Sequence, residues 1–322
     1  MKKKFTSDVL IQNGFLFVFA LAFVFFSTMT DNFFQVQNIL NILHTMAPLA
    51  ITASGLAIVV ISGRLDISVG STAFLSCAIG ALLMKNIGLD PVLAALLVVA
   101  CGAALGAING FIVTVLQVNP LIATLGTMIA FRGIALALTD ALLVQLPEPI
   151  RVLGNAHIGP IPSDVFIMLI VLVGVHVLHA KTAFGRQIVA IGNDIATARK
   201  VGLPVDRTGF LSFVLAGVLA SMGGILTTVQ NGAVSPFLGS GLEFTALAVV
   251  VVGGISLLGG RGTILLSIIS GAFIFEMIRN GLTNLGANPY SYRLVGGAVI
   301  FAAMYADALK SGRLSLKRGS HS

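Results

Sequence analysis

Long apolar stretches alternate with short polar segments along the whole chain. The apolar stretches are about 20 residues long, the length that an α-helix needs to cross a hydrocarbon core of about 30 Å. The pattern predicts ten membrane-spanning helices, at about 10–29, 43–62, 67–84, 92–116, 121–139, 164–180, 209–229, 243–258, 263–281 and 293–309. Because glycines interrupt several stretches, eight spans with re-entrant segments are the alternative.

The composition favours a membrane protein over a soluble one. Charged residues make up 10% of the chain, whereas a soluble domain carries about 25%, and the mean hydropathy is +1.01. The 36 glycines allow the close approach between helices that packing in lipid requires. We therefore predict an all-α, polytopic membrane helical bundle, with residues 1–322 forming a single transmembrane domain.

The N-terminal segment, MKKKFTSDVLIQNGFLFVFALAFVFFSTM, has the basic start and apolar body of a secretory signal. Its apolar body is longer than the roughly 7 to 15 residues of a signal, and no A-x-A cleavage site follows. We interpret the segment as an uncleaved first span.

The positions of Lys and Arg predict the orientation. With the N-terminus in the cytoplasm, the cytoplasmic segments receive 14 of the 19 basic side chains: Lys2, Lys3, Lys4, Arg64, Lys181, Arg186, Arg199, Lys200, Arg207, Arg261, Lys310, Arg313, Lys317 and Arg318. The outer side receives Lys85, Arg151 and Arg293. The positive-inside rule therefore predicts that both termini and the segment 181–208 are cytoplasmic.

Within that polar segment, GRQIVAIGNDIATARKVGLP at 185–204 predicts one short helix. The side chain of Asn193 or Asp194 can accept hydrogen bonds from the first turn of a helix. The next residues, IATARKV, suit a helix of about two turns. Gly202 can supply a left-handed end, and Pro204 prevents continuation.

We expect Ile195, Ala198 and Val201 to share one apolar face of this helix. Such a helix is too short to be stable in isolation, so it needs a surface to pack against. Three surfaces are possible: the membrane interface, the protein's own bundle, or a partner protein.

Several polar residues inside the spans are candidates for function, because ionisable groups in a membrane usually face a cavity or a partner. Arg132 either lines a path or pairs with a carboxylate. Glu276 and Arg279, three residues apart, are expected to pair with each other. Asn109 and Thr124 offer the neutral hydrogen-bonding groups that a sugar needs, although contacts between helices use the same groups.

The chain has no motif for catalysis or for metal binding. His44, His176 and His179 share no ligand spacing apart from the pair in HVLH, and Cys77 and Cys101 suit packing positions in apolar spans. The phosphate loop G-x-x-x-x-G-K-[ST] is absent, so another polypeptide must hydrolyse any ATP. We expect no enzyme activity, no metal and no cofactor bound by this chain.

A weak internal similarity links LAIVVISG at 56–63 with LAVVVVGG at 247–254, and at the same offset Thr72, Ser76, Gly80 and Ala81 recur as Thr263, Ser267, Gly271 and Ala272. Transporters often contain structural repeats. Because Ala, Val, Gly and Ser are so common in this chain, we interpret the similarity as chance.

Four segments, in order, resemble the ribose-type monosaccharide permeases, the inner-membrane subunits of ABC importers. They are ISGRLDISVGS at 61–71, GAINGFIVTVLQVNPLIATLGTMIAFRGIALALT at 106–139, TAFGRQIVAIGNDIATARKVGLP at 182–204, and GLEFTALAVVVVGGISLLGGRGT at 241–263. Arg64 stands where the family usually has Gly, and Thr245 where Asp commonly follows Glu. Both departures leave the substrate open.

The resemblance implies a permease subunit in the bacterial inner membrane that moves a monosaccharide or polyol from periplasm to cytoplasm. It implies three protein partners and no nucleic acid: a second permease subunit (a homodimer or a paralogue), a periplasmic sugar-binding protein, and an ABC ATPase that holds ATP and Mg. Membrane lipid surrounds the subunit. By resemblance, residues of the segment 181–208 couple the subunit to the ATPase: Gly185, Arg186, Gly192, Asn193, Asp194, Ala198, Arg199 and Gly202. The candidates for the substrate path are Asn109, Thr124, Arg132 and Glu243.

Two other classes of protein are alternatives. An ion-driven secondary transporter of a small polar solute would need acidic or histidine relays at mid-membrane, for which Glu276 is the plausible candidate. A membrane enzyme would need a cluster of catalytic groups at one depth, and the sequence offers none.

Overall fold

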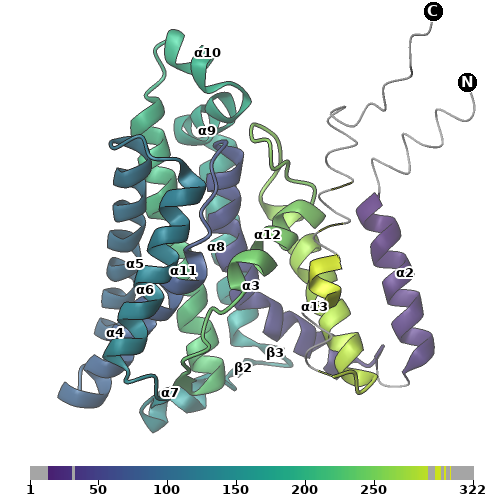
Figure 1. The fold of residues 1–322 in the computed structure, drawn as a ribbon. Helices are drawn as coiled ribbons and strands as arrows, with labels where there is room; N and C mark the ends of the chain where they lie inside the picture. Colours follow the sequence, from purple (N-terminus) through teal and green to yellow (C-terminus); the bar gives the residue numbers. More distant parts are fainter. Residues whose placement is uncertain (1–13, 31–32, 289–293, 299–300, 302–304, 306–322) are drawn as a thin grey trace, which may run out of the picture.

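The computed structural model describes residues 14–30, 33–288, 294–298, 301 and 305, which form a bundle of long helices (Figure 1). In chain order the helices are α2 Gly14–Met29, α3 Val36–Ile61, α4 Val69–Ile87, α5 Pro91–Thr114, α6 Pro120–Leu138, α7 Glu148–Leu153, α8 Ser163–Lys181, α9 Ala183–Asn193, α10 Ile195–Lys200, α11 Val205–Asn231, α12 Leu242–Val252 and α13 Leu265–Asn284. Seven described helices are long and apolar enough to cross a membrane: α3, α4, α5, α6, α8, α11 and α13. The chain is therefore a polytopic helical membrane protein.

Helix α3 lies at the centre of the bundle and contacts α8, α11, α12 and α13. From Met46 to Ile61 its residues are buried, as expected for a helix that is apolar on all sides. It begins at Val36, earlier than the predicted start at 43, because its first turns carry polar residues that a hydropathy pattern leaves out. Pro48 lies inside the helix.

Helices α5 and α11 approach each other through glycines. Gly102, Gly106 and Gly110, spaced four residues apart, face α11. A Cβ on Gly106 would lie 2.3 Å from the carbonyl oxygen of Phe213, and a Cβ on Gly217 would lie 2.1 Å from that of Gly102. Small residues at this spacing let helix backbones touch in lipid.

At the end of the bundle opposite α10, the segment 140–163 folds into short elements (Figure 1). Strand β1 (Val144–Gln145) pairs antiparallel with β4 (Ala233–Val234), and β2 (His157–Ile158) pairs with β3 (Ile161–Pro162). Helix α7 lies between β1 and β2 in the chain. The Pro-rich segment is thus an ordered cover of this end, which we call the α7 end.

The predicted span 243–258 is wrong in its second half. Helix α12 has 11 residues and ends at Val252, where Gly253 and then Gly254, with φ of 91°, turn the chain. At 1.5 Å per residue α12 is about 16 Å long, too short to cross the membrane. Of the first predicted span, residues 14–29 are described, and they are helical. The tenth, 293–309, lies largely outside the described residues, of which 294–298 are helical.

The internal similarity extends to the backbone. Helix α3 ends with hydrogen bonds from the amides of Ser62, Gly63 and Arg64 to the carbonyls of Ile58, Val60 and Val59. At the same offset, the amides of Gly253, Gly254 and Ile255 bind the carbonyls of Val249, Val251 and Val250. Gly63 and Gly254 both have positive φ. The ends of α10 at Gly202 and of α13 at Gly286 have the same pattern. It is a common way of ending a helix, so the shared backbone agrees with the interpretation as chance similarity.

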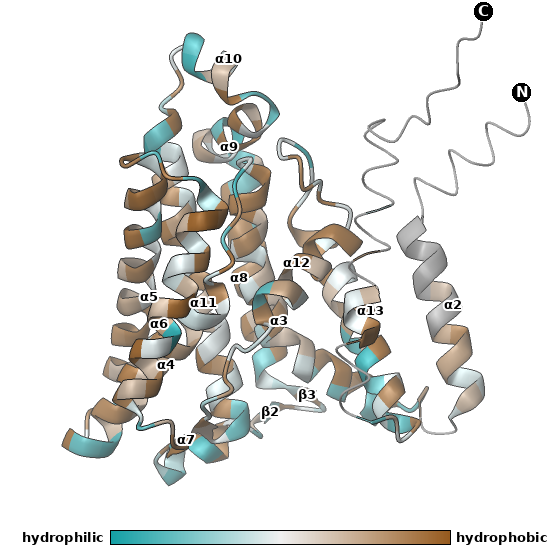
Figure 2. Cartoon of the chain, in the orientation of Figure 1, coloured by the Kyte–Doolittle hydropathy of each residue, from teal (hydrophilic) through white to brown (hydrophobic). Residues whose placement is uncertain are grey.

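Apolar residues dominate the long helices, while hydrophilic residues gather at α10 and at the α7 end (Figure 2). Many large apolar side chains of α5 and α6 are exposed, including Leu96 and Ile129. This distribution fits a bundle whose outer surface meets lipid.

We expect Gly106→Ala to destabilise the bundle by about 1–3 kcal/mol, since the added Cβ meets a backbone oxygen that cannot turn aside. The measurement is thermal unfolding of the purified protein in detergent. Gly133→Ala on α6 is the matched control, because nothing lies within 4 Å of its added Cβ. Equal losses of stability in both variants would contradict the close contact between α5 and α11.

Candidate functional site

The cap predicted for the short polar helix is present in α10. The Oδ1 atom of Asp194 accepts a hydrogen bond from the Thr197 amide at 3.0 Å, and its Oδ2 atom accepts one from the Thr197 hydroxyl at 2.9 Å. These bonds hold the pKa of Asp194 below its usual value. Gly202, with φ of 81°, ends the turn. The predicted start, length and stop of this helix are confirmed.

Helix α9 was missed by the sequence analysis, which expected one helix in 181–208. Thr182 caps it, its hydroxyl accepting from the Gly185 amide at 3.3 Å. Ile188 and Ile191 are buried. The signal was available, because Thr182 precedes apolar residues spaced three and four apart. We call residues 183–200 the α9–α10 unit.

The α9–α10 unit packs on its own bundle through a small apolar cluster. Ala198 is buried with Ile191 and Val205. Ile195 and Val201 are 40% and 70% exposed, respectively. The expectation is wrong for Val201, which lies beyond the last helical residue, Lys200, while Ile195 and Ala198 are three residues apart within α10.

The remaining coupling candidates occupy two kinds of position. Gly185 lies in the first turn of α9 and lets it pack against the end of α8, since a Cβ there would lie 1.8 Å from the carbonyl oxygen of His179. Arg186, Arg199 and Gly202 are exposed. Arg199 forms an ion pair with Asp206 at 2.7 Å, and such an exposed pair contributes little to stability.

Four glycines bring the end of α9 against the end of α3 and the α12–α13 loop. We call Gly63, Gly192, Gly259 and Gly260 the glycine junction. A Cβ on Gly192 would lie 1.8 Å from the carbonyl oxygen of Ile61 and 2.5 Å from the amide nitrogen of Gly260. The Gly260 amide donates to that Ile61 oxygen at 2.8 Å. Three segments far apart in sequence thus meet backbone to backbone.

Asn193 adds a side-chain bond to the glycine junction. Its amide group donates to the carbonyl of Val189 at 2.9 Å and to that of Gly260 at 3.4 Å. The bond to Val189 lies within α9, and the bond to Gly260 reaches the α12–α13 loop. Asn193 therefore serves this contact, and Asp194 alone caps α10.

Residues 62–68, between α3 and α4, have no helical structure and carry one of the two departures from the family pattern. Arg64 is buried, and its guanidinium lies against Gly209, where a Cβ would be 2.7 Å from Cζ. Gly209 therefore makes room for the larger side chain. The other departure, Thr245, donates to the carbonyl of Gly241 within its own helix at 3.1 Å.

Asn109 and Thr124 meet this interruption from α5 and α6. Asp66 accepts from the Ser68 amide at 2.9 Å and from its hydroxyl at 2.7 Å. The Asn109 amide group donates to the Ser68 hydroxyl at 2.7 Å, and the Ile67 amide donates to the Thr124 hydroxyl at 3.3 Å. Both candidates are fully buried. Thr124 binds the interrupted backbone and Asn109 binds the Ser68 side chain, which is the structural alternative left open by the sequence.

Glu243 and Arg132 lie near the same interruption. A Cβ on Gly70, in the first turn of α4, would lie 2.7 Å from Glu243 Oε2. Arg132 donates to the carbonyl of Leu238 at 3.2 Å and lies 5.4 Å from the centre of the Phe74 ring, a cation–π contact. Within the described residues Arg132 forms no ion pair with a carboxylate. It holds the loop that precedes α12.

Three buried polar atoms around the first turn of α4 have no hydrogen-bond partner among the described residues: Ser71 Oγ, Asn109 Oδ1 and Glu243 Oε2. Buried polar atoms are usually paired, so each such atom can accept a hydrogen bond from water or from a solute hydroxyl. We call Asp66, Ser68, Ser71, Asn109, Thr124 and Glu243 the interior polar cluster. Its chemistry suits a polyhydroxylated solute, whereas no cluster of three His, Cys, Asp or Glu that could hold a metal occurs in the described chain.

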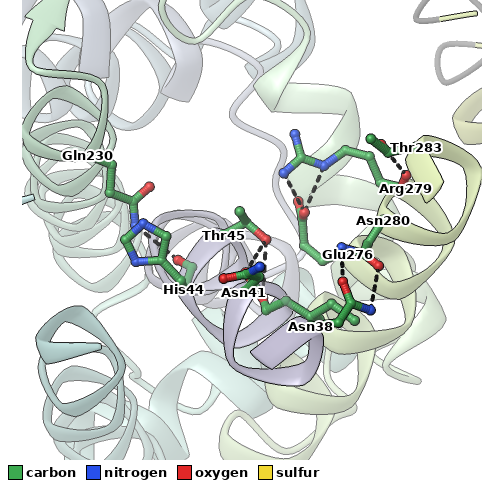
Figure 3. A network of polar contacts seen from close by, with 10 residues as sticks. Asn38, Asn41, His44, Thr45, Gln230, Glu276, Arg279, Asn280 and Thr283 are labelled. Atoms are coloured by element: carbon green, nitrogen blue, oxygen red, sulfur yellow. Dashed lines mark hydrogen bonds and ion pairs between the residues drawn. The ribbon is translucent and has the colours of Figure 1, made fainter. Parts of the chain in front are cut away.

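A second polar network surrounds the first turns of α3 at the α7 end (Figure 3). His44 Nδ1 lies 2.7 Å from Asp164 Oδ2, and Gln230 donates to the His44 carbonyl at 2.9 Å and to Asp164. The sequence pattern does not indicate this group, because its members lie on α3, α8 and α11. The predicted pair of Glu276 and Arg279 is confirmed, with Arg279 Nε 2.7 Å from Glu276 Oε2.

A family model described as branched-chain amino acid transport system / permease component matches residues 38–304. The ribose import permease protein RbsC of Escherichia coli (strain K12) is 34% identical over 314 residues, 96% of this chain and 97% of that protein. The RbsC protein of Bacillus subtilis (strain 168) is 36% identical over 300 residues, 92% of each chain.

A further relative has a different name. The autoinducer 2 import system permease protein LsrC of Klebsiella pneumoniae is 35% identical over 307 residues, 95% of this chain and 87% of that protein. No solved structure matches the chain.

We expect Asp194→Ala to unwind α10 and Asp194→Asn to preserve it, since an amide oxygen can still accept from Thr197. The measurement is hydrogen exchange at the amides of residues 197–202, which should become faster in Asp194→Ala only. Because folding lowers the pKa of Asp194, its contribution should be complete above the usual value of 3.8 and decrease as the pH falls below it. Exchange in Asp194→Ala as slow as in wild type would show that the cap is not needed.

Proposed function

We propose, since the chain belongs to the permease family of ABC sugar importers, that it moves a monosaccharide or polyol into the cytoplasm using a separate ATPase. As a member of that family it is a multi-pass inner-membrane protein and a transport component rather than an enzyme. The family implies two partners, an ATPase and a periplasmic binding protein. A second permease subunit, a copy or a paralogue, completes the proposed transporter.

The observation that carries the proposal is the position of the α9–α10 unit. It projects from one end of the bundle (Figure 1). Ile195 and Val201 are exposed there, beside the basic residues Arg199 and Lys200 of the last turn of α10. Ala198 packs α10 on its own bundle, which leaves Ile195 and Val201 exposed, and an exposed apolar pair framed by charge suits a soluble protein surface. We assign that surface to the ATPase.

The glycine junction supplies a physical route from the ATPase to the membrane. Movement of the α9–α10 unit would displace Gly192 against Ile61 and Gly260, which are backbone neighbours. Because no side chain lies between these backbones, none can change rotamer to absorb the movement, and a close-packed contact of this kind transmits it. From Ile61 the chain leads into residues 62–68 and the interior polar cluster, and from Gly260 it leads towards α12.

The ATPase can shift the permease between outward-facing and inward-facing states only if it binds one state more tightly. Reversing a population from 1:99 to 99:1 takes about 5.5 kcal/mol of differential affinity. ATP and Mg on the partner chain would supply this free energy through the α9–α10 unit.

For the substrate, the names of the relatives point to small polyhydroxylated solutes, ribose and autoinducer 2. The unpartnered oxygens of Glu243 and Asn109 can accept hydrogen bonds from such hydroxyls. Arg132 is held by Leu238 and Phe74, so we propose for it a positioning role beside the path.

Transport measurements with and without ATP test the proposed function. We expect proteoliposomes containing the permease, its ATPase and its binding protein to take up a monosaccharide when ATP is supplied, also after a protonophore has collapsed the proton gradient. An ion-driven secondary transporter would behave in the opposite way, with uptake abolished by the protonophore and independent of ATP.

We expect Gly192→Ala to lower ATP-coupled uptake by about tenfold, within the range typical of coupling between sites. The added Cβ overlaps the Ile61 carbonyl oxygen, so the junction must separate, although the ATPase can still bind to α10. The measurements are uptake and ATPase co-purification. Gly174→Ala on α8 is the control, because its Cβ meets nothing within 4 Å. Unchanged uptake in Gly192→Ala would exclude the junction as the route.

A further inference from the structure

A cavity of about 300 Å³ lies between α4, α5, α7 and α11, near the α7 end of the bundle. Apart from the thiol of Cys77 and the hydroxyl of Thr228, the residues that line it are apolar. None of its lining residues belongs to the α9–α10 unit or to the interior polar cluster. The cavity is partly open to the surface of the chain.

The cavity lies within the depth of one leaflet of a membrane. Its lining runs from Met84 and Pro91, near the ends of α4 and α5, to Cys77 and Val98. From Met84 to Cys77 the rise is about 10 Å at 1.5 Å per residue. Half of a hydrocarbon core is about 15 Å, so the cavity fits the part of an acyl chain nearest the headgroup.

Physical chemistry disfavours an empty or hydrated cavity at this depth. Water enters a cavity only where several polar partners are available, and this lining offers few. Side chains that border a void lose their dispersion contacts. On α5, Val92 and Leu96 are 69% and 62% exposed, so apolar surface continues outward from the cavity.

Basic residues neighbour lining residues in the chain at the outer end of the cavity. Lys85 follows the lining residue Met84 in the last turn of α4. Arg151 follows the lining residue Ile150 on α7, and its side-chain carbons lie against Gly232, just beyond the lining residue Val229 of α11. Both basic residues are exposed and form no ion pair with another described residue. They are two of the three basic residues that the predicted orientation places on the outer side, against the general trend of the chain.

Two carboxylates are also near this end of the cavity. Asp90 accepts hydrogen bonds from the amides of Val92 and Leu93 and so caps α5. Glu148 stands in the first turn of α7. A rim that carries both signs of charge suits a phospholipid headgroup, whose phosphate would lie by the cations.

We propose that the cavity binds one acyl chain of a membrane phospholipid, with the lipid phosphate between Lys85 and Arg151. A second copy of the chain would have to insert a side chain and place acidic groups opposite both cations. A lipid supplies an apolar tail of one leaflet's length and an anionic group at its end. The inference is independent of the ATPase and of the transported solute.

Photocrosslinking tests the proposal. The full chain, in nanodiscs of phosphatidylethanolamine and phosphatidylglycerol, would be irradiated with a phosphatidylethanolamine that carries a diazirine on its acyl chain. We expect crosslinks to residues 77–98 and 225–229. Ala95→Phe, which fills the cavity from a half-buried position, should lower them about tenfold, the factor for a loss of 1.4 kcal/mol. Ala104→Phe, on the exposed face of α5 outside the cavity, should leave them unchanged.

The headgroup is tested with a diazirine-bearing diacylglycerol, which has the same tails and no phosphate. Wild type should crosslink the phospholipid more strongly, and Lys85→Gln combined with Arg151→Gln should remove the difference. Equal crosslinking in Ala95→Phe and Ala104→Phe would mean ordinary surrounding lipid and would overturn the proposal. A disulfide-linked dimer in Ala95→Cys, but not in Ala104→Cys, would overturn it in favour of a second copy.

Discussion

Direct contact between backbones at glycine is the interaction on which this structure depends. In lipid, association of helices gains little from the hydrophobic effect, so close packing must replace it. Gly106 lets α11 lie against α5, and Gly192 lets the end of α9 lie against the carbonyl of Ile61. The first contact holds the bundle together. The second joins the bundle to the unit that we propose as the contact with the ATPase.

Interrupted helices are the second feature, and they lie where the proposed function needs them. Non-helical backbone at membrane depth is tolerated only where its polar groups are bound. Between α3 and α4, the Ile67 amide binds Thr124 and the Ser68 amide binds Asp66. Because α3 ends at the glycine junction, residues 61–68 run directly from the contact with the α9–α10 unit to the interior polar cluster.

Charged groups inside the bundle are largely satisfied by neighbours. Glu276 pairs with Arg279, and Asp164 binds His44 and Gln230 at the α7 end. Asp164 Oδ1 and Glu243 Oε2 are both buried without a hydrogen-bond partner among the described residues. Asp164 still lies against His44, whereas Glu243 forms no ion pair with another described residue. The cost of burying such a group makes it the member of the interior polar cluster with the most to gain from a bound hydroxyl.

Local features were predictable from the sequence by itself. The start and stop of α10, the pairing of Glu276 with Arg279 and the long apolar spans depend on residues a few positions apart, so composition and spacing contain them. Tertiary structure alone decided the glycine junction, the partners of Asn109 and Thr124, the His44 network and the apolar cavity. Each joins segments distant in the chain, and a one-dimensional pattern of hydropathy does not record which backbones come into contact.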